Sequence, residues 1–207
     1  TRQLRRRGYG NLVTRTHAEM ELAERVKVRE FFQRERPGCV FLAAARAGGI
    51  LANNTYPADF IRENLEIQTN VIEEARRAGV RRLLFLAASC IYPRDCPQPM
   101  REASLLAGPV EFTNRPYALA KIAGIEMCWA FNRQYGTSYR VAVPNNLYGP
   151  GDGYDPERSH VLPALIRKFH EAKARGAKSV ALWGTGAPRR EMLYSDDMAE
   201  ACVRLME

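Results

Sequence analysis

The sequence predicts an α/β fold built on an open, doubly wound parallel sheet. Two continuous apolar runs, at 39–45 (CVFLAAA) and 82–88 (RLLFLAA), are typical of parallel strands that are buried on both faces. Helical segments separate these runs from the other strand candidates, and this alternation favours a parallel sheet with right-handed crossovers. The 207 residues are enough for one domain, or for one domain and part of another.

The predicted elements follow one another in the order that such a fold requires. The first residues, TRQLRRRG, are expected to be the second half of a helix that ends at Gly8. Gly79 is a good residue to end a later helix, and the Gly and Pro residues of NNLYGPGDG predict a loop. The predicted strands are 11–14, 39–45, 82–88, 139–143 and 179–183, and the predicted helices are 24–36, 60–78, 117–135 and 160–175.

Composition restricts the classes of function. Hydrophobic residues make up 46% of the chain, and no apolar run predicts a membrane span or a signal peptide. The net charge of +8 is spread along the chain, so we expect a phosphorylated small molecule as partner rather than nucleic acid. The five cysteines form no CxxC pair and there are only three histidines, which predicts no metal site and a reducing, cytoplasmic location.

Tyr117 and Lys121 are the pair that suggests chemistry. They are four residues apart on a predicted helix, so they share one face, roughly 5–6 Å apart at Cβ. A lysine in that position favours the phenolate and would lower the pKa of the phenol. The tyrosine could then donate a proton to a ketone as a hydride arrives, or accept one in the reverse direction. For the bare spacing, an exposed tyrosine and lysine without chemistry is the commoner explanation.

Polar clusters follow three of the predicted strands, and ligands of such sheets bind beyond the carboxyl ends of the strands. Arg15 and His17 follow the first strand, where a dinucleotide-binding fold distinguishes the ribose 2′ position. An arginine suits a 2′-phosphate and hence NADP, although a solvated loop arginine explains Arg15 equally well. The segment 46–49 (RAGG) would let backbone approach a cofactor, and Ser89 and Cys90 would point a hydroxyl and a thiol toward the tyrosine–lysine pair.

Six longer motifs occur in a fixed order from about residue 11 to the C-terminus: AAARAGGILANNTYPADF, LLFLAASCIYP, YALAKIAG, NLYGPGD, SHVLPALIRKFHEAK and WGTGAPRREMLYSDD. On these motifs the chain resembles the GDP-L-fucose synthase family, which are bifunctional 3,5-epimerase/4-reductases among the extended short-chain dehydrogenase/reductases. The resemblance implies an NADP-binding Rossmann fold. It also implies conversion of GDP-4-keto-6-deoxy-D-mannose to GDP-L-fucose.

The resemblance also implies roles for individual residues. Tyr117 would protonate the C4 oxygen during hydride transfer, and Lys121 would tune it and hold the nicotinamide ribose. Cys90 and His160 match the base and acid that invert C3 and C5, because inversion needs one group to remove a proton and another to return it on the opposite face. A thiol is a base only as thiolate, so we expect a nearby positive charge or donor to lower the pKa of Cys90. Without the family, Cys90 is better explained as an inert buried thiol and His160 as a capping or packing residue.

The remaining candidates complete a catalytic, a cofactor and a substrate set. Ser89 joins the catalytic groups. The cofactor set is Arg15, His17, Ala43, Ala44, Ala45, Lys121 and Asn146, and the substrate set is Asn146, Lys168, Trp183 and Arg190, the last through the diphosphate.

Several positions depart from the family pattern, among them Ala88, His17, Lys168, Asn145 and the SDD that replaces VDD. Ala88 stands where the family has Ser or Thr, so the hydroxyl that hydrogen-bonds the C4 oxygen is missing, and losing such a donor can cost on the order of a hundredfold in turnover. His17 replaces a second arginine at the 2′-phosphate, which leaves most of that binding to Arg15. Lys168 replaces an arginine, keeping the charge but losing the bidentate fork.

The two ends of the chain also depart from the family. The first strand and its Gly-rich turn are expected to be missing, roughly 20 residues of the first βαβ unit. We therefore expect 1–150 to form an incomplete NADP-binding domain and 151–207 part of a substrate-binding region. The expected partners are a GDP-sugar and a second copy of the chain, paired through the helices 60–78 and 117–135, with no nucleic acid or membrane. The alternatives are a non-catalytic remnant of the family and another nucleotide-sugar epimerase or dehydratase.

Overall fold

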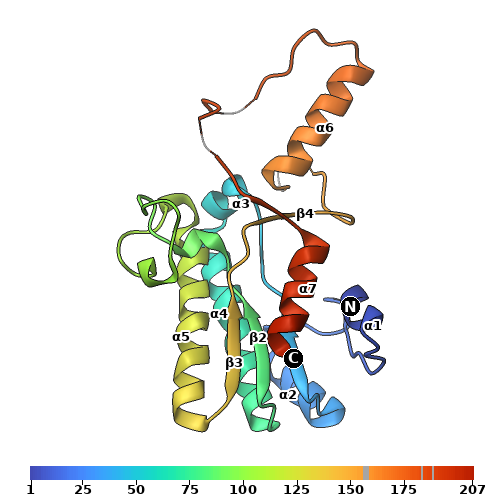
Figure 1. Ribbon diagram of the computed structural model, residues 1–207, viewed down its shortest axis with the longest axis vertical. Coiled ribbons are helices and arrows are strands. Elements are labelled where there is room, and N and C mark those ends of the chain that lie inside the picture. Colours follow the sequence, from blue (N-terminus) through green and yellow to red (C-terminus); the bar gives the residue numbers. More distant parts are fainter. Residues whose placement is uncertain (156–158, 183, 188) are drawn as a thin grey trace.

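The computed structural model describes residues 1–155, 159–182, 184–187 and 189–207, and Figure 1 shows its elements. No helix in these ranges is long and apolar enough to cross a membrane. The helices are α1 Arg2–Arg6, α2 Arg25–Glu35, α3 Ile50–Thr55, α4 Pro57–Arg77, α5 Arg115–Tyr135, α6 Val161–Ala174 and α7 Ser195–Met206, with 3₁₀ turns η1 Ser89–Ile91, η2 Glu102–Ser104 and η3 Phe112–Asn114. The strands are β1 Cys39–Leu42, β2 Arg82–Leu86, β3 Ser138–Ala142, β4 Asn146–Tyr148 and β5 Met192–Tyr194.

The main sheet is parallel, with strand order β1-β2-β3. Cys39 pairs with Arg82, and Arg82 pairs with Ser138, so the three strands begin at the same level. Their carboxyl ends therefore lie along one edge, which we call the carboxyl edge. The chain passes from β1 to β2 through α3 and α4, and from β2 to β3 through α5. This is the parallel α/β arrangement that the apolar runs predict.

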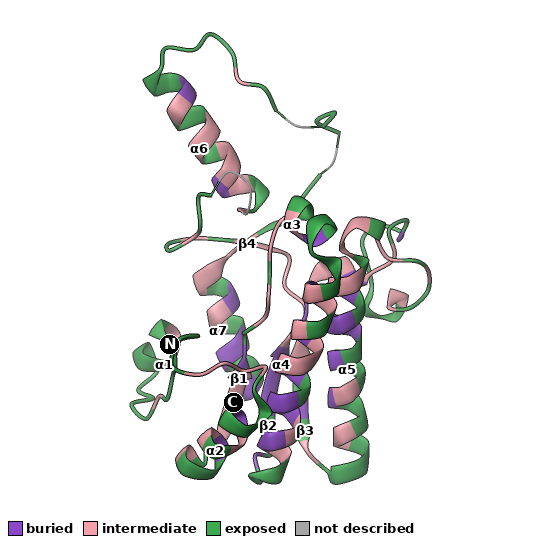
Figure 2. Cartoon of the chain, turned by 180° about the vertical axis from the view of Figure 1, so that it is seen from behind, coloured by how far each residue is buried: buried purple, intermediate pink, exposed green. Residues whose placement is uncertain are grey.

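The side chains of β2 supply both hydrophobic cores. Leu83 and Phe85 are fully buried in the core with α4 and α5, where they join Ile72 and Ile125. Leu84 is also fully buried, but its core is the one formed with α7. Successive side chains of a strand point to opposite faces, so a continuous apolar run requires cover on both sides. Figure 2 shows the buried residues concentrated where α4 and α5 meet the sheet.

A second, smaller part of the molecule lies beyond the carboxyl edge. It comprises the described residues of 143–194, which we call the outer lobe: the parallel pair β4–β5, with Asn146 opposite Met192, and α6. In Figure 1, α6 stands away from the main sheet. Ile166 and Phe169 on α6 are 50% and 52% exposed. After this lobe the chain returns in α7 to pack on the main sheet. The division at residue 150 stays a prediction.

Two predicted strands do not form. Residues 11–14 have no strand partner, and no residue of 1–24 is buried, so nothing supplies the ladder bonds and cover that a strand needs. Residues 179–182 are irregular and mostly exposed, and Trp183 lies outside the described residues. The predicted loop NNLYGPGDG contains β4, because β5 returns to pair with it. Sequence patterns did not predict α3, β5 or α7.

Candidate active site

The tyrosine–lysine pair lies at the carboxyl edge. Pro116 opens α5, which places Tyr117 in its first turn and Lys121 one turn further on. The Lys121 ammonium is 5.8 Å from the centre of the Tyr117 ring, so the two side chains share a face. Its Nζ donates to the carbonyl oxygen of Leu86, the last residue of β2, at 2.9 Å. This bond holds the buried ammonium where the strand ends.

Cys90 joins this pair through the turn that follows β2. It lies in η1 together with Ser89, whose carbonyl accepts from the backbone N–H of Tyr92. The charge of Lys121 acts on the Cys90 thiol, and the thiol in turn acts on the Tyr117 phenol. The structure therefore brings Cys90, Tyr117 and Lys121 together, and Ser89 lies in the same turn.

Burial controls the protonation of these three groups. It raises the pKa of Tyr117 above its ordinary value and lowers the pKa of Lys121 to about 8. Burial also raises the pKa of Cys90 to about 11, although a backbone hydrogen bond and the charge of Lys121 act in the opposite direction. The expected lowering of the Tyr117 and Cys90 pKa values is therefore wrong for this structure. Desolvation outweighs the charge of Lys121 at Cys90, and at Tyr117 desolvation and the neighbouring Cys90 both raise the pKa. At neutral pH the phenol and the thiol both carry their protons.

The loop that leaves β1 is fastened to α4 beside this cluster. Asn64 accepts from the backbone N–H of Arg46 at 3.1 Å and donates to its carbonyl at 3.0 Å. The Arg46 guanidinium pairs with Glu63 at 2.6 Å and lies 5.3 Å from the ring centre of Phe60. The Phe60 ring in turn meets Tyr117 edge-on, with 6.3 Å between ring centres. These contacts hold the loop that follows β1 in place beside Tyr117.

Sequence reasoning missed the supporting residues Asn64 and Gln68. Both are buried on α4, and Gln68 donates to the carbonyl of Ala120, next to Lys121, at 2.6 Å. The sequence does contain a pattern that could have revealed them. Two amide side chains, four residues apart, occupy the face of α4 that otherwise carries apolar residues. Buried amides at helical spacing require partners, and here those partners are backbone groups of the site.

Arg15 and His17 do not lie at the carboxyl edge. Arg15 pairs with Glu35 at 2.6 Å and lies over the Phe31 ring, both near the end of α2 that leads into the beginning of β1. His17 pairs with Glu21, and its side chain is 86% exposed. The predicted role of the two residues at a 2′-phosphate stays a prediction. Of the other predicted cofactor residues, Ala43 and Ala44 are exposed and Ala45 is half-buried; all three lie directly after β1.

The predicted substrate residues belong to the outer lobe. His160 is the exposed N-cap residue of α6, and its side chain makes no capping hydrogen bond. Asn146 in β4 donates to the carbonyl of Glu191 at 3.1 Å. Arg190 is exposed before β5, and Lys168 is half-buried on α6. Trp183 lies outside the described residues. Within the described residues, no hydrogen bond or ion pair joins His160 to Cys90.

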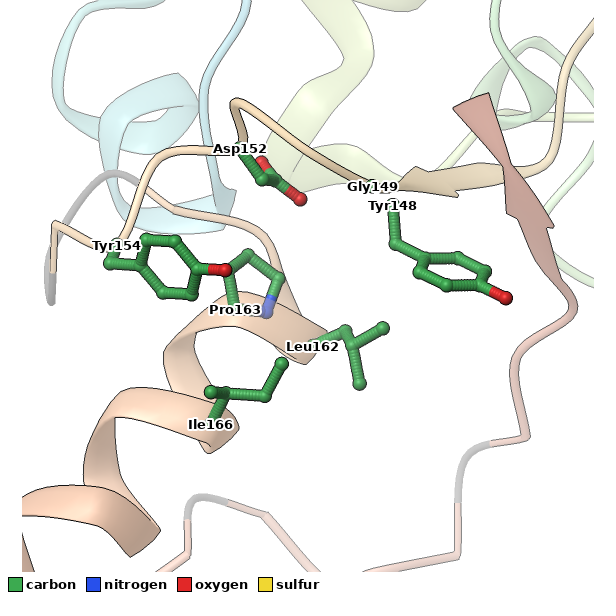
Figure 3. A pocket seen from close by; sticks show the side chains of 7 residues that line it. All are labelled: Tyr148, Gly149, Asp152, Tyr154, Leu162, Pro163 and Ile166. Carbon is green, nitrogen blue, oxygen red and sulfur yellow. The ribbon is translucent and has the colours of Figure 1, made fainter. Parts of the chain in front are cut away.

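A pocket of about 120 Å³ lies between the end of β4 and α6 (Figure 3). Leu162 and Ile166 project from α6 toward it, and the side chains of Tyr148 and Tyr154 flank them. Asp152 supplies a carboxylate on the loop side. The pocket therefore combines apolar and aromatic surface with one carboxylate. Its remaining lining residues are Gly149 and Pro163.

A parallel sheet with helices on both faces and polar side chains gathered at its carboxyl edge defines an open α/β protein of the nucleotide-binding class. The chain belongs to the NAD dependent epimerase/dehydratase family, which matches residues 1–207. The family resemblance and the fold class expected from the sequence motifs are thereby confirmed.

Two curated relatives align with the chain over its whole length. It is 56% identical over 206 residues to GDP-L-fucose synthase 1 of Arabidopsis thaliana and 54% identical over 206 residues to GDP-L-fucose synthase of Escherichia coli K12. Each alignment covers 100% of this chain, and the chain spans 64% of the length of each relative. Among solved structures, a GDP-mannoheptose C4 reductase from Campylobacter jejuni with NADP bound superposes with a TM-score of 0.89 at 36% identity, covering 99% of this chain and 69% of the other.

Proposed function

We propose that this protein is an NADP-dependent epimerase/reductase that converts GDP-4-keto-6-deoxy-D-mannose to GDP-L-fucose by 3,5-epimerisation and 4-keto reduction. One observation carries the proposal: identity of 54–56% to GDP-L-fucose synthases across the chain, including the segments that hold Tyr117, Lys121 and Cys90. The gathering of these three residues at the carboxyl edge supports it, because ligands of such sheets bind there.

In the reduction step, Tyr117 is the proton donor. Bound NADPH supplies a hydride to C4 of the keto sugar, and the C4 oxygen must gain a proton as the hydride arrives. Burial keeps the phenol protonated at neutral pH, which is the form that a proton donor requires. The Lys121 ammonium, on the same face of α5, stabilises the phenolate that remains.

Cofactor binding would involve the open end of β1. The exposed alanines Ala43 and Ala44 leave the backbone accessible at that point of the carboxyl edge. Lys121 would hold the nicotinamide ribose, and Asn146 would contribute from β4. For Arg15 to bind a 2′-phosphate, it has to exchange Glu35 for the phosphate, so the cost of breaking that ion pair would weaken cofactor affinity.

In the epimerisation step, Cys90 removes a proton at C3 and at C5, and His160 returns a proton at each. Cys90 must lose its proton before it can act as the base, and its raised pKa makes the thiolate scarce at neutral pH. His160 comes from the outer lobe, at the start of α6, and would return the proton. The pocket of Tyr148 and Asp152 suits the guanine base, because the N–H groups of guanine can donate hydrogen bonds to the Asp152 carboxylate.

The proposal also covers location and assembly. All five cysteines are free, which fits a reducing, cytoplasmic environment. A homodimer would use the outer faces of α4 and α5, where Leu119 and Trp129 on α5 are 40% and 51% exposed. Analytical ultracentrifugation of the chain and of a Trp129→Arg variant tests the dimer, and a monomer at every concentration would contradict it.

The deciding experiment is a fluorescence titration of the 207-residue chain with NADPH, followed by turnover of GDP-4-keto-6-deoxymannose. We expect saturable binding in the micromolar range and formation of GDP-L-fucose. NADH is the matched control, because it lacks the 2′-phosphate. Binding of neither cofactor would count against a catalytic role, and reduction without exchange of the C3 and C5 protons would indicate a simple C4 reductase.

A further inference from the structure

The turn of α5 that follows Lys121 packs on β2 at unusually short range. A Cβ atom added at Gly124 would lie 2.5 and 2.7 Å from two ring atoms of Phe85, and 2.8 Å from Oε1 of Gln68. Such distances are too short for any real side chain, so a residue other than glycine must displace the ring or the amide. Gly124 does not have a positive φ, so its backbone does not require glycine. The packing requires it, in a helix that alanine would stabilise.

The ring that occupies this space lies beneath the catalytic lysine. The Lys121 ammonium is 4.7 Å from the centre of the Phe85 ring and donates to the Leu86 carbonyl at 2.9 Å. Phe85 is fully buried, so its ring is surrounded by other protein groups. Gln68 lies beside it and is held by its bond to the carbonyl of Ala120. The ring is therefore held between Gly124 and the ammonium.

We propose that Gly124 is a positioning residue for Lys121: the space left by its missing side chain holds the Phe85 ring against the ammonium, and the ring keeps the ammonium at the end of β2. A buried ammonium has three donors, and the hydrogen bonds described for Lys121 provide one acceptor, Leu86. The face of an aromatic ring supplies a second electrostatic partner without adding a polar atom to the core. The consequence for turnover rests on the proposed function, but the packing itself does not.

A double-mutant cycle on Gly124 and Phe85 tests this arrangement. The readout is the pKa of Lys121, measured by NMR on the 207-residue chain and assigned by loss of its signal in Lys121→Met. In the unmodified protein this pKa is lowered, to about 8, because the ammonium is buried. Phe85→Leu removes the aromatic face that favours the charged form, so the pKa should fall by roughly one pH unit. Gly124→Ala displaces the ring and should lower the pKa in the same direction.

The combination of the two substitutions distinguishes a shared cause from separate ones. In Gly124→Ala/Phe85→Leu we expect no fall beyond that of Phe85→Leu alone, because the ring through which Gly124 acts is already gone. Additive falls, or an unchanged Lys121 pKa in Gly124→Ala, would overturn the inference. If Gly124→Ala does not fold, the double variant should fold because the shorter leucine removes the two closest contacts, those with the Phe85 ring, and leaves only the contact with the Gln68 amide. If Gly124→Ala and the double variant both fail to fold while Phe85→Leu folds, the Phe85 ring is not the group that requires glycine at position 124.

A control separates this effect from helix stability. Ala123 is the exposed neighbour of Gly124, and Ala123→Gly weakens α5 by about the amount that an alanine at 124 would strengthen it. The pKa of Lys121 should not change in this variant. The NMR cycle needs no cofactor, so it remains informative if NADPH does not bind and the proposed function fails. Conversely, if the unmodified chain turns over normally but the Lys121 pKa is unshifted in Gly124→Ala, the proposed function stands and only the inference about Gly124 is overturned.

Discussion

The proposed catalytic cluster of Cys90, Tyr117 and Lys121 differs from the outer lobe in how its residues are held. Lys121 is 4% exposed, and its ammonium is fixed by the Leu86 carbonyl and the Phe85 ring. His160 and Arg190 in the outer lobe are exposed, and Arg190 donates only to the carbonyl of the preceding residue among the contacts described. Figure 1 shows α6 standing apart from the main sheet and the helices that pack on it. The core of the chain therefore positions Tyr117 and Lys121, the residues proposed for reduction, whereas we expect a bound ligand to position His160 and Arg190.

Tyr117→Phe should have the largest effect. It removes the proton donor while keeping the ring against Phe60, so NADPH oxidation should fall by roughly 10²- to 10⁴-fold. Deuterium exchange at C3 and C5 of the keto sugar should persist, because it does not need the phenol. Cys90→Ala should show the reverse pattern, with exchange lost. Isotope exchange by NMR and NADPH oxidation by absorbance measure the two steps, and equal loss of both activities in both variants would contradict this division.

The next largest effect concerns the pH dependence of the Cys90 thiol. Burial raises its pKa to about 11, so at pH 8 its alkylation should be roughly a hundredfold slower than that of an ordinary exposed thiol, and should still be rising at pH 10. Lys121→Met removes the positive charge that favours the thiolate, so it should slow alkylation further at pH values up to about 8, where Lys121 still carries its charge. Peptide-resolved mass spectrometry with iodoacetamide follows Cys90 separately from the other thiols. A plateau near pH 9 would contradict the burial argument.

The same contrast explains which features could be predicted from the sequence. The shared face of Tyr117 and Lys121 follows from helix geometry alone, because residues four apart are neighbours in any α-helix. β1 and β2 lie within the runs 39–45 and 82–88 because an apolar run of that length needs cover on both faces. Both features depend on nearby residues or on the general rules of a parallel sheet, so they were predictable.

Other features depend on partners that no local pattern reveals. The direction of the Cys90 pKa shift depends on how deeply η1 is buried, and the sequence showed only the charge that Lys121 could supply. The strand predicted at 11–14 lacks a neighbour, and the strand β4 exists because β5 returns to it from more than forty residues away. Arg15 was expected at the carboxyl edge but pairs with Glu35 instead. Tertiary neighbours decided each of these outcomes.

A change in the body of the molecule should alter stability even far from the cluster. The Glu74 side chain is 2% exposed and pairs with Arg25 at 3.0 Å and Arg29 at 3.4 Å, which joins α4 to α2. Burial opposes its ionisation, but the two arginines lower its pKa overall. Glu74→Gln should therefore lower the free energy of unfolding by about 1–2 kcal/mol at pH 7, a modest loss because both arginines remain partly solvated.

Acid weakens the ion pair of Glu74, because protonation removes the charge of its carboxylate. A carboxylate with a lowered pKa stabilises the fold above its ordinary value near 4.5, and this stabilisation disappears as the pH falls through the lowered pKa. The difference between the protein and Glu74→Gln should accordingly shrink on acidification, as measured by urea unfolding at several pH values. Glu66→Gln, which alters the surface pair with Arg62, is the matched control and should change stability little. Equal effects of the two substitutions would show that the buried pair adds nothing.

The smallest effect on stability should come from His160→Gln in the outer lobe. His160 is exposed and its side chain does not cap α6, so the free energy of unfolding should change by less than about 0.5 kcal/mol, while isotope exchange at the keto sugar should be lost. Asn132→Ala is the comparison in the body, because its amide accepts from the backbone N–H of Tyr139 and donates to its carbonyl, both at 2.7 Å, and its loss leaves those groups unpaired. Urea unfolding of both variants measures the difference. If His160→Gln destabilised the chain as much as Asn132→Ala, the outer lobe would be packed through His160, and the view that a ligand positions this residue would fail.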